Sequence, residues 1–178
     1  MLENLDDPTY DLLFSIRRSV RYHKHRRRFY EAWNTLTITV ALIGGSSSVV
    51  IAVGDLWPNY LPLIPAVVTI VDIIDLAVGT SVRKAGHHGE LAWRFIQLEK
   101  AVPIDISLSK EEIEKVKKER LEIEASEPSI MRLLDVMCHY EILKSYGHEK
   151  SLPKVPFLRR FMIHFFSQTS YARSLPAI

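Results

Sequence analysis

Two long apolar segments dominate the pattern of hydrophobic and polar positions along the chain. No charged residue occurs from Ala32 to Gly54, and in the second segment, from Leu56 to Val82, only Asp72 and Asp75 are charged. An α-helix rises about 1.5 Å per residue, so either segment is long enough to cross a hydrocarbon layer of about 30 Å. The pattern predicts a membrane hairpin of two transmembrane helices. The alternative is a buried helical hairpin in a soluble protein.

Helical periodicity continues on both sides of the hairpin. Pro8 follows two aspartates, as at a helix start, and neither Gly nor Pro occurs between Thr9 and Gly44. A long helix is therefore expected to lead into the first apolar segment, and residues 83–101 are expected to extend the second one before a turn at Val102-Pro103. The apolar stripes of these two extensions are Leu13, Ile16 and Val20, and Leu91, Phe95 and Leu98.

Two further helices are expected downstream. Ser109 and Glu112 have the spacing of a capping box, which predicts a charged helix to about Ala125. Another helix is expected over residues 128–146, with Gly147 as its stop. Its apolar residues at helical spacing are Ile130, Leu133, Leu134, Met137, Tyr140 and Leu143.

Composition divides the chain into four segments within an all-α fold. Residues 1–31 form a basic N-terminal cytoplasmic helix, 32–82 the transmembrane hairpin, 83–149 cytoplasmic helices, and 150–178 a basic, aromatic C-terminal tail. The tail is expected to form a C-terminal helical region. Its residues 156–166 are too few to span a membrane. They are expected to lie either in the membrane interface or on a neighbouring subunit.

Basic residues at the ends of the hairpin predict its orientation. Arg26, Arg27 and Arg28 precede the first segment, and Arg83 and Lys84 follow the second, so both termini are expected to be cytoplasmic. Aromatic residues suited to the headgroup region are Trp57 and Tyr60 in the connecting loop and Trp33 at the inner face. The 31 mostly polar residues before the first segment do not resemble a secretory signal, and the single Cys138 fits a reducing compartment.

Asp72 and Asp75 lie three residues apart near the middle of the second segment and share a helix face with Thr69 and Gly79. An Asp at the centre of an inserted helix is unfavourable by about 2.5 to 3.5 kcal/mol, so this face is expected to avoid lipid. One hairpin brings no cation to the two acids, which favours a homo-oligomer of four or more subunits. The acids then line the axis of an ion-conducting pore, lie protonated or hydrogen-bonded in a closed packing interface, or relay protons.

Small residues in the first segment allow close approach of helices. Gly44, Gly45 and Ser48 are the positions at which helix packing is expected.

Basic residues also predict an anionic partner. Membrane lipid is one candidate. The other is a phosphate-bearing ligand whose phosphates are bound by arginines and whose base stacks on Tyr22 or Phe29. The residues assigned to this role are Arg17, Arg18, Arg21, Lys24, Arg26, Arg27, Arg28, Arg83 and Lys84.

Catalysis, metal binding and a bound cofactor are not expected. Neither His23 and His25, two residues apart, nor the adjacent His87 and His88 have the i, i+4 spacing of histidines that bind zinc, and no glycine-rich phosphate loop or nucleophile motif occurs. A pH-responsive role for these histidines is conceivable.

The order of these features resembles the SLATT family of bacterial two-helix membrane effectors. The features are the Arg- and His-rich helix, Tyr30-Glu-Ala-Trp33 at the membrane, two spans joined by a short loop, then Arg83 and Leu91-Ala-Trp-Arg-Phe-Ile-Gln-Leu98. The resemblance covers residues 10–146. It implies a pore-forming effector of antiphage defence by abortive infection, in the bacterial inner membrane, held silent until a signal acts on it. That signal is a nucleotide or oligonucleotide made by a partner nucleotidyltransferase, or a separate partner protein.

Two function hypotheses follow. The first is a homo-oligomeric ion channel of the cytoplasmic membrane whose cytoplasmic helices gate the flow of permeating ions. The second is a non-conducting membrane scaffold that recruits a soluble partner or nucleic acid through its basic helices. A proton-coupled transporter is a weaker third candidate, because one chain supplies only two spans and no pair of discontinuous helices.

Overall fold

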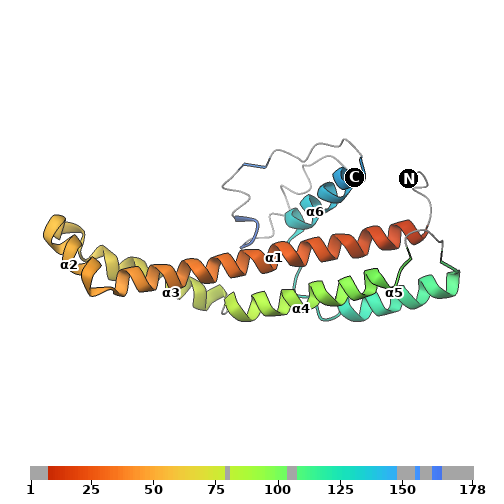
Figure 1. The fold of residues 1–178 in the computed structure, drawn as a ribbon, viewed down its shortest axis with the longest axis horizontal. Coiled ribbons are helices and arrows are strands. Elements are labelled where there is room, and N and C mark those ends of the chain that lie inside the picture. Colours follow the sequence, from red (N-terminus) through yellow and green to blue (C-terminus); the bar gives the residue numbers. More distant parts are fainter. Residues whose placement is uncertain (1–7, 79–80, 104–107, 148–154, 157–161, 166–178) are drawn as a thin grey trace. The chain divides into compact units, whose positions relative to one another are not determined.

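The computed structural model describes residues 8–78, 81–103, 108–147, 155–156 and 162–165, without the side chains of residues 47, 48, 77 and 78. All regular elements in these ranges are helical, which confirms the all-α prediction for this part of the chain (Figure 1). The elements are α1 (Pro8–Gly45), α2 (Ser47–Leu56), the short 3₁₀ helix η1 (Pro58–Tyr60), α3 (Leu63–Val78), α4 (Ser81–Lys100), α5 (Lys110–Glu124) and α6 (Arg132–Ser145).

The chain forms two compact parts. The first, here called the helical body, comprises residues 1–26 and 88–178. The second, here called the hairpin, comprises residues 27–87. The long helix α1 and the helix α4 each contribute residues to both parts, as the uninterrupted helical periodicity of their sequences predicts.

The main core of the helical body lies where α1 packs against α4 and α5. The predicted stripes are buried here, with Ile16 and Phe95 both 0% exposed. The helix α5 adds Ile113, Val116 and Ile123, and its other residues are exposed or half-buried. This helix begins as predicted, with Ser109 and Glu112 forming a capping box. Its single apolar stripe therefore suffices to hold a strongly charged helix in place.

A smaller core lies where α1 packs against α6, on the other side of α1 from α4 and α5 (Figure 1). It joins Tyr22 of α1 to Leu133, Leu134 and Cys138 of α6. The helix begins at Arg132, four residues later than predicted, because the backbone of Met131 is extended and its N–H donates to the Tyr22 hydroxyl at 2.9 Å. Gly147, with φ of 83°, follows the end of the helix, as expected of a glycine stop.

Residues 162–165 of the C-terminal tail pack on the helical body of their own chain. Ile163 is 1% exposed and belongs to the core around Tyr22 and Leu133. The expectation of a membrane-interface segment or a contact with a neighbouring subunit stays a prediction, and Ile163 adds a contact within the chain that this expectation did not include. The remaining residues of the tail, apart from 155–156, lie outside the described part of the chain.

In the hairpin, the first apolar segment is a broken helix and not one straight span. Between α1 and α2, Ser46 is extended, with φ of −73° and ψ of 121°. The helix axis turns by 63° between α1 and residues 49–56. Gly44 and Gly45 account for the position of the break, since each is about 1 kcal/mol less favourable in a helix than Ala. The expected continuous helix over residues 32–54 is thus corrected to a bent pair.

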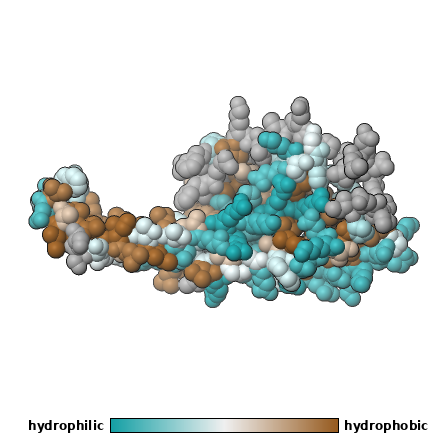
Figure 2. All heavy atoms as spheres, viewed as in Figure 1, coloured by the Kyte–Doolittle hydropathy of each residue, from teal (hydrophilic) through white to brown (hydrophobic). Residues whose placement is uncertain are grey.

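Many large apolar side chains of the hairpin are exposed in the described part of the chain (Figure 2). The stretch Pro58–Lys100 is long and apolar enough to cross a membrane, and none of its most apolar window is buried. The bent pair of α1 and residues 49–56 adds a second candidate if it is counted as one span. The described residues therefore contain one or two helices that meet the requirements of a membrane span.

Candidate functional site

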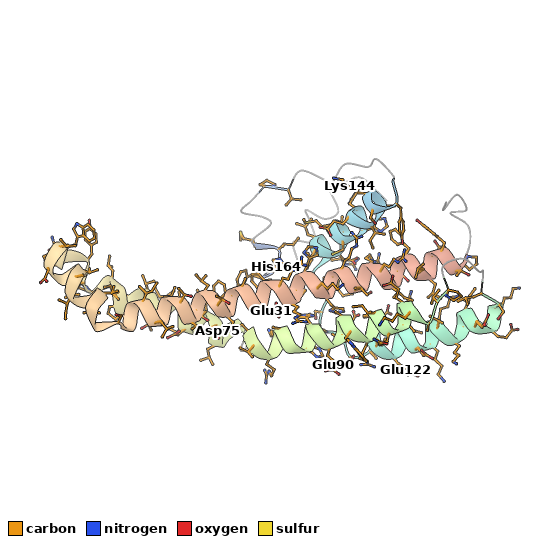
Figure 3. The ribbon with its side chains drawn as sticks, in the orientation of Figure 1. Glu31, Asp75, Glu90, Glu122, Lys144 and His164 are labelled. Carbon is orange, nitrogen blue, oxygen red and sulfur yellow. The ribbon has the colours of Figure 1, made fainter. Side chains whose placement is uncertain are left out.

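The acids of the second apolar segment occupy different surroundings on α3. Thr69 and Asp72 are exposed, whereas Asp75 is half-buried (Figure 3). The Oδ1 atom of Asp75 is buried and makes no hydrogen bond. Gly79, the fourth residue of the predicted face, lies outside the described residues.

Burial separates the two acids because Asp75 belongs to a packing stripe. The half-buried residues Ile64, Val68, Val71 and Asp75 recur every three or four positions along α3, the period of one helix face. Asp72 lies outside this stripe. The two carboxylates therefore differ in exposure within a single chain: that of Asp72 is open to whatever surrounds the hairpin, and that of Asp75 is partly covered by it.

The three small residues also differ in their surroundings. A Cβ atom on Gly44 would overlap the Cγ2 atom of Val68 and lie 3.4 Å from Cγ2 of Ile64, so α1 and α3 approach closely there. A Cβ atom on Gly45 would meet no atom within 4 Å. The side chain of Ser48 is not described. Gly44 thus lies at a contact within the hairpin, and Gly45 lies on its open side.

An apolar groove of about 430 Å³ lies between α1, α2, η1 and α3. Its walls are Val40, Ile43, Gly44, Val49, Val53, Trp57, Tyr60, Leu63, Ile64, Val67 and Val68. With no charged residue in its walls, the groove suits hydrocarbon and not a polar ligand.

Several polar side chains of the hairpin have hydrogen-bond acceptors within the hairpin. The hydroxyls of Thr35, Thr37 and Thr39 donate to backbone carbonyls three or four residues earlier, at 2.7 to 3.0 Å. Ser81, 1% exposed, donates to Oδ1 of Asn34 at 3.4 Å. Of the predicted headgroup residues, Trp57 and Tyr60 are 59% and 60% exposed. Trp33 differs: it is 8% exposed and packs within the hairpin.

The first arginines of the basic helix bind groups of the helical body. Arg17 donates from Nε to Glu99 at 2.7 Å and from Nη1 to the Tyr146 hydroxyl at 2.6 Å. Burial alone would lower the pKa of the Arg17 guanidinium, but these two hydrogen bonds together with the charges of Tyr146 and Glu99 outweigh it and raise the pKa. The guanidinium is therefore a cross-link between α1, α4 and the end of α6 and has little capacity left for an external anion.

The next two arginines are also engaged. Arg18 lies 3.2 Å from Asp135, and Arg21 donates to the Ser145 hydroxyl at 3.0 Å. Lys24 is exposed. The predicted anion-binding face of α1 is thus reduced, in this part of the helix, to one exposed cation and two cations with partners on α6.

Arg26 lies inside the helical body. It is 5% exposed and donates from Nη1 to the carbonyl oxygen of His164 at 2.6 Å (Figure 3). Burial, with smaller contributions from the charges of Arg26 and His25, lowers the pKa of His164 to about 3. His164 is therefore neutral at physiological pH, and Arg26 fixes the tail to α1.

The basic residues of the hairpin are mostly exposed. Arg27 forms an ion pair with Glu31 at 2.7 Å, and Arg28 and Arg83 are exposed. Lys84 lies over the ring of Tyr30, with 5.8 Å between Nζ and the ring centroid. These are the surroundings expected of cations at the edge of an apolar segment.

Two histidines that were set aside in the sequence occupy the interior of the helical body. His23 of α1 and His88 of α4 are 0% and 2% exposed, and their Nδ1 atoms are 2.9 Å apart. The Nε2 atom of His23 is 3.1 Å from Oε1 of Glu127, in the connection between α5 and α6. Phe95 stacks on the His23 ring with an interplanar angle of 15°.

The spacing of the two histidines from the apolar residues of their helices is the sequence signal that could have located this pair. His23 follows Ile16 and Val20 at intervals of four and three, and His88 precedes Leu91 and Phe95 at intervals of three and four. Both histidines therefore extend the predicted core stripes of their helices. Reading them as neighbours in sequence, with His25 and His87, concealed this relationship.

The described residues contain no group of three or more His, Cys, Asp or Glu side chains able to hold a metal ion. Comparison of the chain with known protein families, curated proteins and solved structures finds no match. The function therefore has to be inferred from the arrangement of the residues themselves.

Proposed function

We propose that this protein is a membrane effector of antiphage defence that assembles into a homo-oligomeric pore and disrupts the bacterial inner membrane when a signal opens it. The observation that carries the proposal is an exposed carboxylate, Asp72, in a long apolar helix whose most apolar window contains no buried residue among those described. The membrane, the pore and the oligomer are each inferred from the solvation requirements of this helix.

The uncovered surface supports membrane insertion. Leu76 is 75% exposed and Leu42 is 70% exposed, with many other large apolar side chains of the hairpin above 50%. Burying such surface in lipid is favourable by roughly 25 cal/mol per Å² of apolar area. The internal hydrogen bonds of Thr35, Thr37 and Thr39 remove the penalty that free hydroxyls would bring into hydrocarbon.

The positions of the acids support an assembly around water. Among the described residues no cation forms an ion pair with Asp72, and an Asp in lipid is unfavourable by about 2.5 to 3.5 kcal/mol. Subunits that turn Asp72 toward a common axis would shelter it from lipid and form a ring that attracts cations. Asp75, half-buried with Oδ1 unpartnered, then supports the packing of the hairpin behind the ring.

The defence role and the nucleotide-type trigger rest on the resemblance to SLATT effectors. The exposed Lys24, Arg28 and Arg83 are the cations that remain for an anionic ligand or for lipid headgroups. Buried Arg26 and cross-linked Arg17 are structural. The recruiting scaffold is the weaker proposal, because three of the arginines that it would use, Arg17, Arg18 and Arg26, bind groups of the same helical body.

The test is membrane depolarisation in bacteria that express the full chain, followed by ion flux from liposomes that contain the purified protein. Asp72→Asn is expected to abolish both, because it removes the proposed ring of charge and leaves the apolar helix able to insert. Asp75→Asn is expected to retain conduction. Asp55→Asn, the same change at an exposed site in the connecting loop, is the matched control and is expected to behave as the native chain.

Equal conduction by the native chain and Asp72→Asn would reject Asp72 as a pore-lining residue. A monomer in lipid nanodiscs, with no depolarisation in cells, would reject the pore and favour the scaffold. The scaffold predicts instead that neutralising Lys24, Arg27 and Arg28 releases a bound partner.

A further inference from the structure

The His23–His88 contact sets a strict rule on protonation. Two Nδ1 atoms 2.9 Å apart form a hydrogen bond only when one carries a proton and the other presents its lone pair. Both rings are buried, so water cannot replace a lost partner. The contact therefore depends on the number of protons that the two rings hold together.

The first proton added to the neutral pair leaves the contact intact. A charged His23 donates from Nδ1 to His88 and from Nε2 to Glu127, whose carboxylate lies 3.1 Å away. The charge of His23 is then balanced by Glu127. In this state, as in the neutral one, the hydrogen bond between the two Nδ1 atoms joins α1 to α4.

The second proton removes the bond. With both rings charged, two N–H donors face each other across 2.9 Å with no acceptor between them. Like charges at this distance repel strongly in a buried site, where the effective dielectric constant is low. The carboxylate of Glu127 lies at Nε2 of His23, so it does not accept a hydrogen bond from either of the two facing Nδ1 atoms.

We propose that His23 and His88 form a buried proton-binding site that keeps α1 and α4 packed while one Nδ1 proton is shared, and that releases this contact when both rings are protonated. The ligand is the hydrogen ion itself, taken from solvent. The site lies within the helical body and does not depend on the proposed pore function. Its physical effect is a loss of local order in α1 and α4 on acidification.

Charged groups on the surrounding helices also affect how this part of the protein responds to acid. On α4, Arg94 donates to the hydroxyl of Ser126, the residue before Glu127, at 3.3 Å. On α1, Arg26 follows His23 by three residues, close to one helical turn. Positive charge near an imidazole disfavours its protonation. On α6, burial raises the pKa of Asp135, and the charges of Arg18 and Arg132 partly oppose this. A raised carboxyl pKa makes acid favour the folded state, so Asp135 cannot produce the expected loss of order.

The experiment is hydrogen–deuterium exchange of the full chain in nanodiscs at about pH 7.5 and about pH 5.0, the interval in which the histidines of an opened segment gain protons. Rates are corrected for the intrinsic pH dependence of exchange. Protection of the segments around His23 in α1 and His88 in α4 is expected to fall by about tenfold at the lower pH.

The decisive variant is His88→Asn. The Asn side-chain amide lies near the position of Nδ1 and either donates or accepts, so it keeps a partner for His23 in both protonation states. It is expected to remove the pH-dependent loss of protection. His87→Asn, the same change at the exposed neighbouring position, is the matched control and is expected to lose protection as the native chain does.

Two results overturn the proposal: no pH-dependent loss in the native chain, or an undiminished loss in His88→Asn. If His88→Asn does not fold at about pH 7.5, ¹⁵N spectra of histidine-labelled native protein decide instead. Full protonation of both buried rings at the pH where protection falls supports the proposal. Loss of protection while the rings still share a proton contradicts it.

Discussion

Gly44 lies against Val68 with no room for a methyl group between them. This contact brings the end of α1 onto α3 within the hairpin. The neighbouring Gly45 has open space on its Cα, so two adjacent glycines of one helix end have opposite tolerances for a side chain.

Gly44→Ala is expected to destabilise the hairpin relative to Gly45→Ala by about 1 to 3 kcal/mol, the usual effect of forcing a methyl group into a packed contact. Both changes gain up to about 1 kcal/mol of helix propensity, which cancels in the comparison. The measurement is unfolding by increasing SDS in mixed micelles. Equal midpoints for the two variants would show that α1 and α3 do not meet at Gly44.

Ile163→Ala is expected to lower the free energy of unfolding by about 2 to 4 kcal/mol, as for other fully buried aliphatic residues. Met162→Ala, at a position 38% exposed, is the matched control and is expected to change stability by less than about 1 kcal/mol. Thermal unfolding followed by circular dichroism distinguishes them. If Ile163→Ala is as stable as the control, the tail does not contribute to the core around Tyr22.

Cys138 is expected to resist thiol reagents while the helical body is folded. The thiol is fully buried, and burial, reinforced by the charges of Glu141 and Asp135, raises the pKa of Cys138 far above its usual range. The reactive thiolate is therefore nearly absent at neutral pH. Labelling by a maleimide should be at least about a hundredfold slower in the native protein than in denaturant. Rapid labelling without denaturant would mean that α6 separates readily from α1.

The start of α5 is expected to weaken in acid. Hydrogen bonding from the backbone and hydroxyl of Ser109 lowers the pKa of Glu112, so this carboxylate stabilises the helix above its unfolded-state pKa and loses that effect as the pH falls through the lower folded-state value. Backbone exchange over residues 110–114 should increase across this acidic range. Glu112→Gln should remove that pH dependence, whereas Glu111→Gln, which lies outside the capping box, should retain it.

Much of the helical fold follows from sequence signals that act locally. The capping box at Ser109 and Glu112 defines the start of α5, and the stripe through Leu91, Phe95 and Leu98 defines the buried face of α4. Each of these signals requires only the residues of one helix, so periodicity and capping rules suffice to find them.

The features that sequence analysis missed depend on contacts between distant residues. The start of α6 is delayed by a hydrogen bond from Met131 to Tyr22, and the tail is fixed by Ile163 and by the bond from Arg26 to His164. The pair of His23 and His88 was visible only as an extension of two core stripes. Charge counting along α1 likewise did not reveal that Arg17 and Arg18 have acidic partners on other helices.

The ion pairs of Arg17 with Glu99 and of Arg18 with Asp135 lower the affinity of the folded chain for polyanions relative to that of the unfolded chain. In the folded helical body these guanidinium groups are neutralised in place, and unfolding would set them free along one short stretch of backbone. A partly denatured sample should therefore adhere to heparin or to phosphatidylserine vesicles more strongly than a native one. Retention on such surfaces would serve as a gauge of misfolding.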